Sequence, residues 1–196
     1  MPSETDIANI ALRLVGGTRI TSLTQGTPNA NAVQDLYSEL RDHLLEFPWN
    51  FTTKRVELAR STTAPGFGYD FAYTLPSDWM FTISVYDNDA GAGTIDYRHE
   101  QVASQNVIST SSLQVYLVYA YRETDTNLMP SAFRTALASA LARDLAITVA
   151  NSNTLEDQLS KRATKDLAHA KSLDAMGSFP EARPRGTWSN SRNGFR

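Results

Sequence analysis

The fold is decided by residues 129–176, MPSAFRTALASALARDLAITVANSNTLEDQLSKRATKDLAHAKSLDAM. Two helices are predicted here, over residues 131–150 and 154–175, because apolar residues recur at helical spacing on both sides of the Asn151-Ser152-Asn153 break. The first helix carries few charges, and its many alanines let neighbours approach closely on all sides, so we expect it to be central. The second helix has one apolar stripe and one charged face, so it should lie outside.

The N-terminal region predicts two more amphipathic helices, over residues 3–15 and 28–47. The apolar residues of the first recur at i, i+3, i+4 and i+7, namely Ile7, Ile10, Ala11 and Leu14. Thr27-Pro28 begins the second helix, because proline fits the first helical turn. The aromatic segment FPWNF at residues 47–51 is typical of a corner packed into a core.

Residues 53–128 predict a small antiparallel β unit of three or four strands, inserted between the helices. Here the apolar period changes from helical spacing to two, and strands are expected near residues 54–58, 79–85 and 113–121. Residues 87–93, DNDAGAG, predict a hairpin tip, whereas the polar residues 99–112 predict a long loop.

The predicted fold class is α+β, in three parts. Residues 1–52 and 129–176 form a four-helix bundle, residues 53–128 form the antiparallel β unit, and residues 177–196 form an extended basic C-terminal tail. The tail holds four arginines against one glutamate and is rich in glycine, proline, serine and asparagine. Such a composition buries too little apolar surface to fold alone.

Composition narrows the classes of function. The chain has 196 residues, is 41% hydrophobic and has a net charge of −3, so we expect a globular protein without the positive charge of a nucleic-acid coat. It contains no cysteine, which excludes disulfides and thiolate chemistry. Its N-terminus lacks the pattern of a secretion signal, and no apolar run is long enough for a membrane span. We therefore expect a soluble, unsecreted protein.

The sequence does not predict a catalytic residue, a metal site or a cofactor. The histidines lie in different predicted elements, and the glycine-rich segments lack the rest of a nucleotide-binding fingerprint. Two carboxylate pairs, Asp70/Asp78 and Asp87/Asp96, could act as acid and base in a glycosidase, but the sequence does not fix their separation.

Four segments, taken in their order and spacing, resemble a phage protein family. They are NANA at residues 29–32, PWNF at 48–51 with Lys54-Arg55 and Leu58-Ala59 after it, YTLPSDW at 73–79, and MPSAF at 129–133 leading to Leu137 and Leu141-Ala142. Over most of its length the chain resembles the head-to-tail adaptors, which include the tail tubular protein A of short-tailed phages.

The resemblance implies a non-enzymatic virion protein of the viral tail, located at the portal vertex and assembled in the host cytoplasm. Its copies would form a ring, commonly of twelve subunits, bound to the portal protein above and to a tail nozzle or tube protein below. Genomic DNA would pass through the lumen without sequence-specific contacts, and no membrane would be involved. In this family the helical bundle and C-terminal tail tend to face the portal, and the strand region tends to face the next tail protein.

Two groups of contact residues follow from the tail composition and from this resemblance. The portal-docking tail combines aromatic anchors with arginines, and consists of Phe179, Arg183, Arg185, Trp188, Arg192, Phe195 and Arg196. The loops expected to face the tail protein contain Asp87, Asn88, Asp89, Ser104, Gln105 and Asn106. Two alternative functions stay open, a virion-associated polysaccharide hydrolase and a small DNA-binding helical protein.

Overall fold

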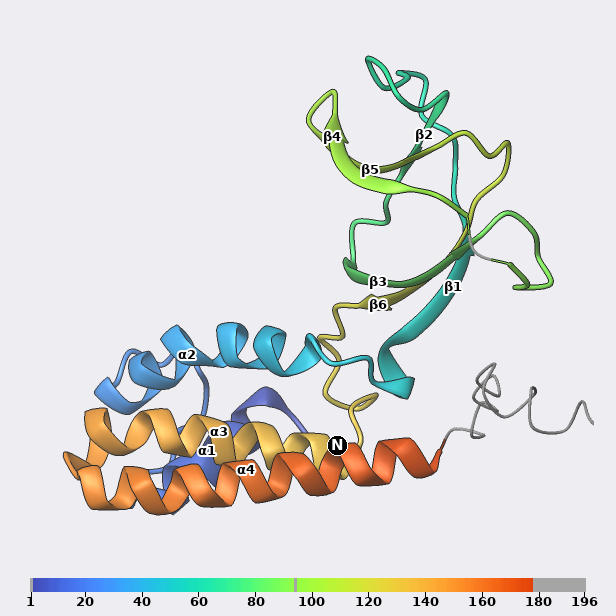
Figure 1. Cartoon of the computed structure of the whole chain (residues 1–196). Helices are drawn as coiled ribbons and strands as arrows, with labels where there is room; N and C mark the ends of the chain where they lie inside the picture. The colour runs from blue at the N-terminus through green and yellow to red at the C-terminus, as the bar shows by residue number, and fades with distance from the viewer. Residues whose placement is uncertain (1, 94, 178–196) are drawn as a thin grey trace, which may run out of the picture.

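The computed structural model describes residues 2–93 and 95–177, which form an α+β protein in two parts (Figure 1). One part is a layer of helices, here called the helical body, made of α1 (Glu4–Leu14), α2 (Pro28–Leu45), α3 (Ser131–Ala150) and α4 (Asn153–Met176). The other part, here called the β module, has two three-stranded antiparallel sheets within the described residues. The predicted α+β class, with helices and an inserted antiparallel unit, is confirmed.

Local signals in the sequence set the helix ends. Ser3 caps α1 by accepting a hydrogen bond from the Asp6 backbone N–H, and the Asp6 carboxylate accepts one from the Ser3 N–H in return. Helix α3 ends at Asn151, whose φ of 47° is one that asparagine tolerates better than most residues. Ser152 then accepts a hydrogen bond from the Leu155 N–H and begins α4. Two residues therefore reverse the chain at the predicted break.

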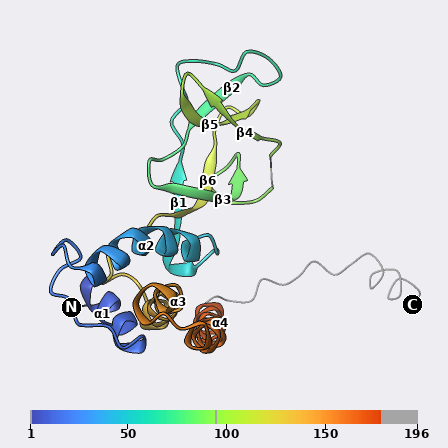
Figure 2. The same cartoon turned by 90° about the vertical axis from the view of Figure 1, so that its left-hand side faces the viewer.

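Helix α3 is the centre of the helical body, as its sequence predicts. Helices α1, α2 and α4 all pack against it (Figure 2). Ten residues of α3 are buried and five of these are alanine, which lets three neighbouring helices approach closely. Helix α4 buries only Leu159, Ala163 and Ala170, so it is an outer helix.

One predicted core position of α1 is wrong. Ile10 is 38% exposed, whereas Ala8 and Leu12 are fully buried. Helix α1 packs against α3 and buries Ile7, Ala8, Ala11 and Leu12, so its buried face is rotated away from Ile10. Ile7 and Ala11 of the predicted apolar stripe are buried and Leu14 is half-buried, so Ile10 is the one member of the stripe that lies off the buried face.

The β module is a sandwich of two sheets around a small core. The sheet nearer to the helical body, here called the proximal sheet, has the order β1-β6-β3, with β1 (Thr53–Glu57), β6 (Tyr116–Tyr121) and β3 (Trp79–Tyr86). The distal sheet has the order β2-β5-β4, with β2 (Phe71–Thr74), β5 (Gln105–Thr110) and β4 (Arg98–Val102). Tyr73, Val85, Ile108 and Leu117 fill the space between the sheets.

The prediction of a long polar loop over residues 99–112 is wrong. Most of this segment forms β4 and β5, which pair as an antiparallel hairpin. The turn between them is Ala103-Ser104, with φ values of 50° and 65°, and it carries neither the glycine nor the asparagine that signals such a turn. Most side chains of β4 are polar and are half-buried or exposed. The sequence of β4 therefore lacks the alternation of apolar and polar residues that would predict a strand.

The predicted hairpin at residues 87–93 is also wrong. Strand β3 pairs with β6, and β4 pairs with β5, so residues 87–97 connect the proximal sheet to the distal sheet. The structure therefore has two sheets where the sequence predicted one unit of three or four strands. Strand β2, which was not predicted, completes the distal sheet through its pairing with β5.

The β module stands on one side of the helical body, near one end of the helices (Figure 1). The chain leaves the body through the 3-10 helix η1 (Asn50–Thr52) and returns from β6 to α3 through residues 122–130. Met80 of β3 packs against the core of the helical body, so the two parts share a contact beyond these two crossings.

Candidate assembly surfaces

The junction between the two parts begins with an aromatic corner around Trp49. The Trp49 side chain is buried, and its indole N–H donates to the Leu44 carbonyl at 2.8 Å. Its ring meets Phe133 of α3 edge to face at a centroid distance of 5.3 Å, and Phe51 meets Phe133 at 5.1 Å. Edge-to-face pairs of this kind contribute about 0.5–1.5 kcal/mol each beyond the area they bury. The corner therefore fixes η1, and with it the start of β1, against α3.

A polar cluster then links the strands of the proximal sheet at the end nearer to the helical body, here called the root of the sheet. The Lys54 ammonium donates to the Asp78 carboxylate at 2.8 Å, and the Tyr119 hydroxyl donates to its other oxygen at 3.1 Å. Lys54 also lies 3.6 Å from the centroid of the Tyr121 ring. Burial, together with the hydrogen bond to Asp78, raises the pKa of Tyr119 to about 12, so its hydroxyl stays a donor at neutral pH.

Charged side chains connect this root to α1 and α2. Arg122, just after β6, lies 3.1 Å from Asp42 of α2, and Asp42 also accepts from Arg41 at 2.8 Å. Arg41 is nearly buried and reaches Glu4 of α1 at 3.8 Å. The chain of contacts runs from α1 through α2 to the end of β6. It restricts the orientation of the β module on the helical body.

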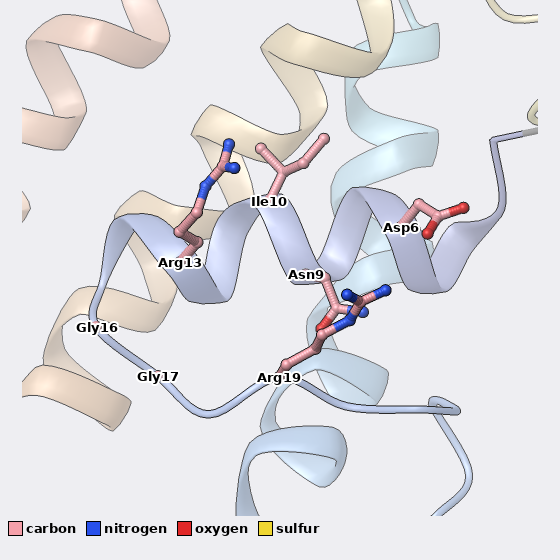
Figure 3. A pocket seen from close by; sticks show the side chains of 7 residues that line it. All are labelled: Asp6, Asn9, Ile10, Arg13, Gly16, Gly17 and Arg19. Atoms are coloured by element: carbon pink, nitrogen blue, oxygen red, sulfur yellow. The ribbon is translucent and has the colours of Figure 1, made fainter.

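The outer flank of α1 carries a shallow hollow of about 550 Å³ (Figure 3). Asn9 positions the rim, because its side chain exchanges two hydrogen bonds of 2.9 Å with the backbone of Ile20 and holds the following loop against α1. Ile10 and Arg13 lie on one side of α1 in Figure 3, whereas Arg19 lies on the other side beside Asn9, and all four residues line the hollow. An exposed apolar side chain with cations around it is suited to a protein contact.

Strand β1 forms a second open surface, at one edge of the proximal sheet. Its residues from Lys54 to Glu57 are all exposed, although successive side chains point to opposite faces of a strand. Both faces and the free edge of β1 are therefore uncovered within the described chain. Charged side chains on such an edge discourage indiscriminate strand pairing.

The residues predicted to face a tail protein do not lie together. Asp87, Asn88 and Asp89 follow β3, where Asn88 and Asp89 line a small hollow on the proximal sheet with Arg55 and Tyr86. Ser104 lies in the β4–β5 turn, and Gln105 and Asn106 belong to β5 instead of to a loop. The segment after β3 and the β4–β5 turn lie on opposite sides of the β module (Figure 1).

The portal-docking residues predicted in the tail, Phe179 to Arg196, lie outside the described residues. The last described residues border an apolar groove of about 290 Å³, here called the α4 groove, between the aromatic corner and the end of α4. The groove was not predicted, because it joins three distant segments of the chain. Its one signal in the sequence is Leu173, which continues the apolar stripe of α4 and is 46% exposed.

The carboxylates considered for hydrolysis have separate surroundings. Asp78 is engaged by Lys54 and Tyr119, whereas Asp70 is exposed before β2. The Asp87 carboxylate accepts from the neighbouring Asn88 side-chain amide at 2.7 Å, and Asp96 is exposed. Across residues 2–93 and 95–177, no cluster of three His, Cys, Asp or Glu side chains could hold a metal ion. In the same part of the chain, no helix is both long and apolar enough to span a membrane.

No family model matches the chain, and no curated protein matches it significantly.

Proposed function

We propose that this protein is a structural adaptor of a phage virion, whose copies form a ring between the portal vertex and the tail. In this proposal the ring holds about twelve copies, has no enzymatic activity, and leaves a lumen for the genome. The proposal starts from the resemblance of the sequence to the head-to-tail adaptors. The structural observation that supports it is that several of the segments that carry this resemblance lie close together in the fold.

Three of the four segments meet at the junction between the helical body and the β module. Trp49 and Phe51 come from the second segment, and both contact Phe133 of the fourth. Lys54, which follows the second segment, pairs with Asp78 of the third at 2.8 Å. The first pair of contacts lies in the helical body and the second in the β module, on either side of the point where the chain crosses between them. We infer that ordering both sides of this crossing helps to fix the angle between the two parts. A fixed angle is what a subunit needs if identical contacts are to close a ring.

A ring of identical subunits also needs two different surfaces, one on each flank of the subunit, that bind each other in neighbouring copies. Figure 2 looks along the helices and places α1 and α4 on opposite sides of α3. The flank of α1 offers Ile10, Arg13 and Arg19, and α4 offers exposed charged residues of both signs, such as Asp157 and Lys161. In the proposed ring, the α1 flank of one copy meets the α4 flank of the next.

The two ends of the subunit would then serve different partners. The β module, which projects from the helical layer in Figure 1, would contact the nozzle or tube protein of the tail. The C-terminal tail, with Trp188 and its arginines, would dock on the portal protein.

The decisive experiment is electron microscopy of the purified protein mixed with portal rings from the same phage. We expect a second ring beneath the portal, with the same or a related symmetry. Ile10→Glu should weaken ring formation, because it places a charge in the proposed subunit contact. Ile147→Glu is the matched control, since Ile147 is also an exposed helical isoleucine, at 52% exposure, but belongs to α3. A single copy at the portal vertex of the virion would refute the proposal.

A further inference from the structure

The α4 groove is an apolar surface at the point where the described chain ends. Phe51, Phe133 and Ala170 line it, and Leu173 lies at its border with a half-exposed side chain. Met176, the last residue of α4, directly precedes the lining residue Gly177 in the chain and is 79% exposed. Large exposed apolar side chains next to an apolar groove indicate that something covers them.

The groove is held open by specific contacts between its two walls. The Asn50 backbone N–H donates to both carboxylate oxygens of Asp174, at 3.0 and 3.1 Å. The Asn50 side-chain amide donates in turn to the Asp174 carbonyl, at 2.6 Å. These bonds join η1 to the last turn of α4 across 124 positions of sequence. The groove is therefore a preformed feature, which lowers the entropic cost of filling it.

The sequence beyond the groove supplies an occupant. Gly177 lines the groove, and Phe179 follows two positions later. Two residues can span about 7 Å, which keeps the Phe179 ring within reach of Leu173 and Phe51. Pro180 favours an extended conformation for Phe179 and opposes continuation of α4, so the chain should turn away from the helix axis here.

We propose that the α4 groove is the binding site for the Phe179 side chain of the same chain. The short connection gives Phe179 an effective concentration in the millimolar range or above, and the longer connections to Trp188 and Phe195 make this advantage smaller for them. The occupied groove would set the direction in which residues 180–196 leave the helical body. This proposal does not depend on the ring adaptor function, because it concerns a contact within one chain.

Competition with a free peptide tests the proposal in the full-length protein. The probe is a fluorescent peptide of residues 178–196, and its binding is measured by fluorescence anisotropy. In wild type the groove is already filled, so the peptide should bind at least tenfold more weakly than it binds the Phe179→Ala protein. The Trp188→Ala protein should behave as wild type, because Trp188 is not the anchor. A peptide that carries the Phe179→Ala change should not bind the emptied groove.

A second pair of variants places the peptide in the groove. In the Phe179→Ala background, Leu173→Glu should abolish binding of the wild-type peptide, whereas Ile147→Glu should leave it unchanged. Far-UV circular dichroism checks that all of these proteins are folded. Equal binding of the peptide to wild type and to Phe179→Ala would overturn the proposal, as would no binding to a folded Phe179→Ala protein. Failure of ring formation in the portal experiment would leave this result unaffected.

Discussion

Replacing Asp78 by asparagine tests how firmly the β module is fixed at its root. Asp78 accepts from the Lys54 ammonium at 2.8 Å and from the Tyr119 hydroxyl at 3.1 Å, so it joins β1 and β6 just before β3 begins. Asparagine keeps the shape and one acceptor oxygen, but it removes the charge and turns an amide NH₂ group toward one of the two donors. The variant therefore isolates the electrostatic part of the contact.

The size of the effect follows from the exposure of the pair. A hydrogen bond to a charged group contributes about 1.5–3 kcal/mol when it is well buried. The side chains of Lys54 and Asp78 are 45% and 35% exposed, and solvent screening reduces exposed ion pairs to about 0.2–1 kcal/mol. With the Tyr119 bond included, Asp78→Asn should lower the free energy of unfolding by about 1 kcal/mol at pH 7.

The contribution of Asp78 to stability should depend on pH, and the direction of its pKa shift sets the direction of this dependence. Burial raises the pKa of Asp78, but the hydrogen bonds from Lys54 and Tyr119 outweigh burial and bring the pKa below its ordinary value of 3.8. A carboxylate with a lowered folded-state pKa contributes stability that is present above pH 3.8 and is lost as pH falls through the folded-state pKa. The difference between wild type and Asp78→Asn should therefore shrink in strong acid.

Urea unfolding followed by circular dichroism, at pH 7 and again about two pH units below the ordinary carboxyl pKa, measures both effects. Asp70→Asn is the control, because Asp70 is exposed and lies in the same module. The reasoning is refuted if Asp78→Asn loses as much stability in acid as at pH 7, or if Asp70→Asn costs as much.

Two further predictions concern other contacts of the fold. Replacing Ala103-Ser104 by Asn-Gly should raise the free energy of unfolding by about 1 kcal/mol, because both positions have positive φ, which asparagine and glycine adopt more easily. Thermal unfolding should show a higher midpoint, and a lower midpoint would contradict this prediction. Ser139→Ala should cost about 1–2 kcal/mol in urea unfolding, because the buried Ser139 hydroxyl donates to Asp166 of α4 at 2.6 Å. The exposed Ser172→Ala is its control, and equal costs for the two serines would exclude a special role for this bond.

The helices could be predicted because their signals are local. The predicted helix over residues 131–150 has the same bounds as α3, since Pro130 precedes its first turn and Asn151 supplies the left-handed end. Its central position could be predicted from its many alanines, because this inference does not require knowing which helices pack against it. The face of α1 could not be predicted equally well, because the choice between Ile10 and Ala8 depends on the surface of α3 that it meets.

The strands and the surfaces depend on contacts between distant residues. Strands β4 and β5 are largely polar at their tip, and only Val107 and Ile108 among the central residues carry an apolar signal. Their turn uses Ala103-Ser104, so the usual turn residues are missing as well. The α4 groove is formed by three segments that the sequence does not show to be neighbours.

The junction explains why the two parts of the protein depend on each other. The core of the helical body contains residues before η1, such as Leu45, and residues after the β module, such as Phe133 and Leu141. Thr126 donates to the Pro2 carbonyl and Asn50 donates to Asp174, each across 124 positions of sequence. Closing the body therefore carries the entropic cost of a long loop, and a folded β module reduces that cost by bringing the ends of β1 and β6 together. The Asp78 side chain stabilises the pairing of β1 with β6. Replacing it should therefore lower the stability of the helical body as well as that of the β module.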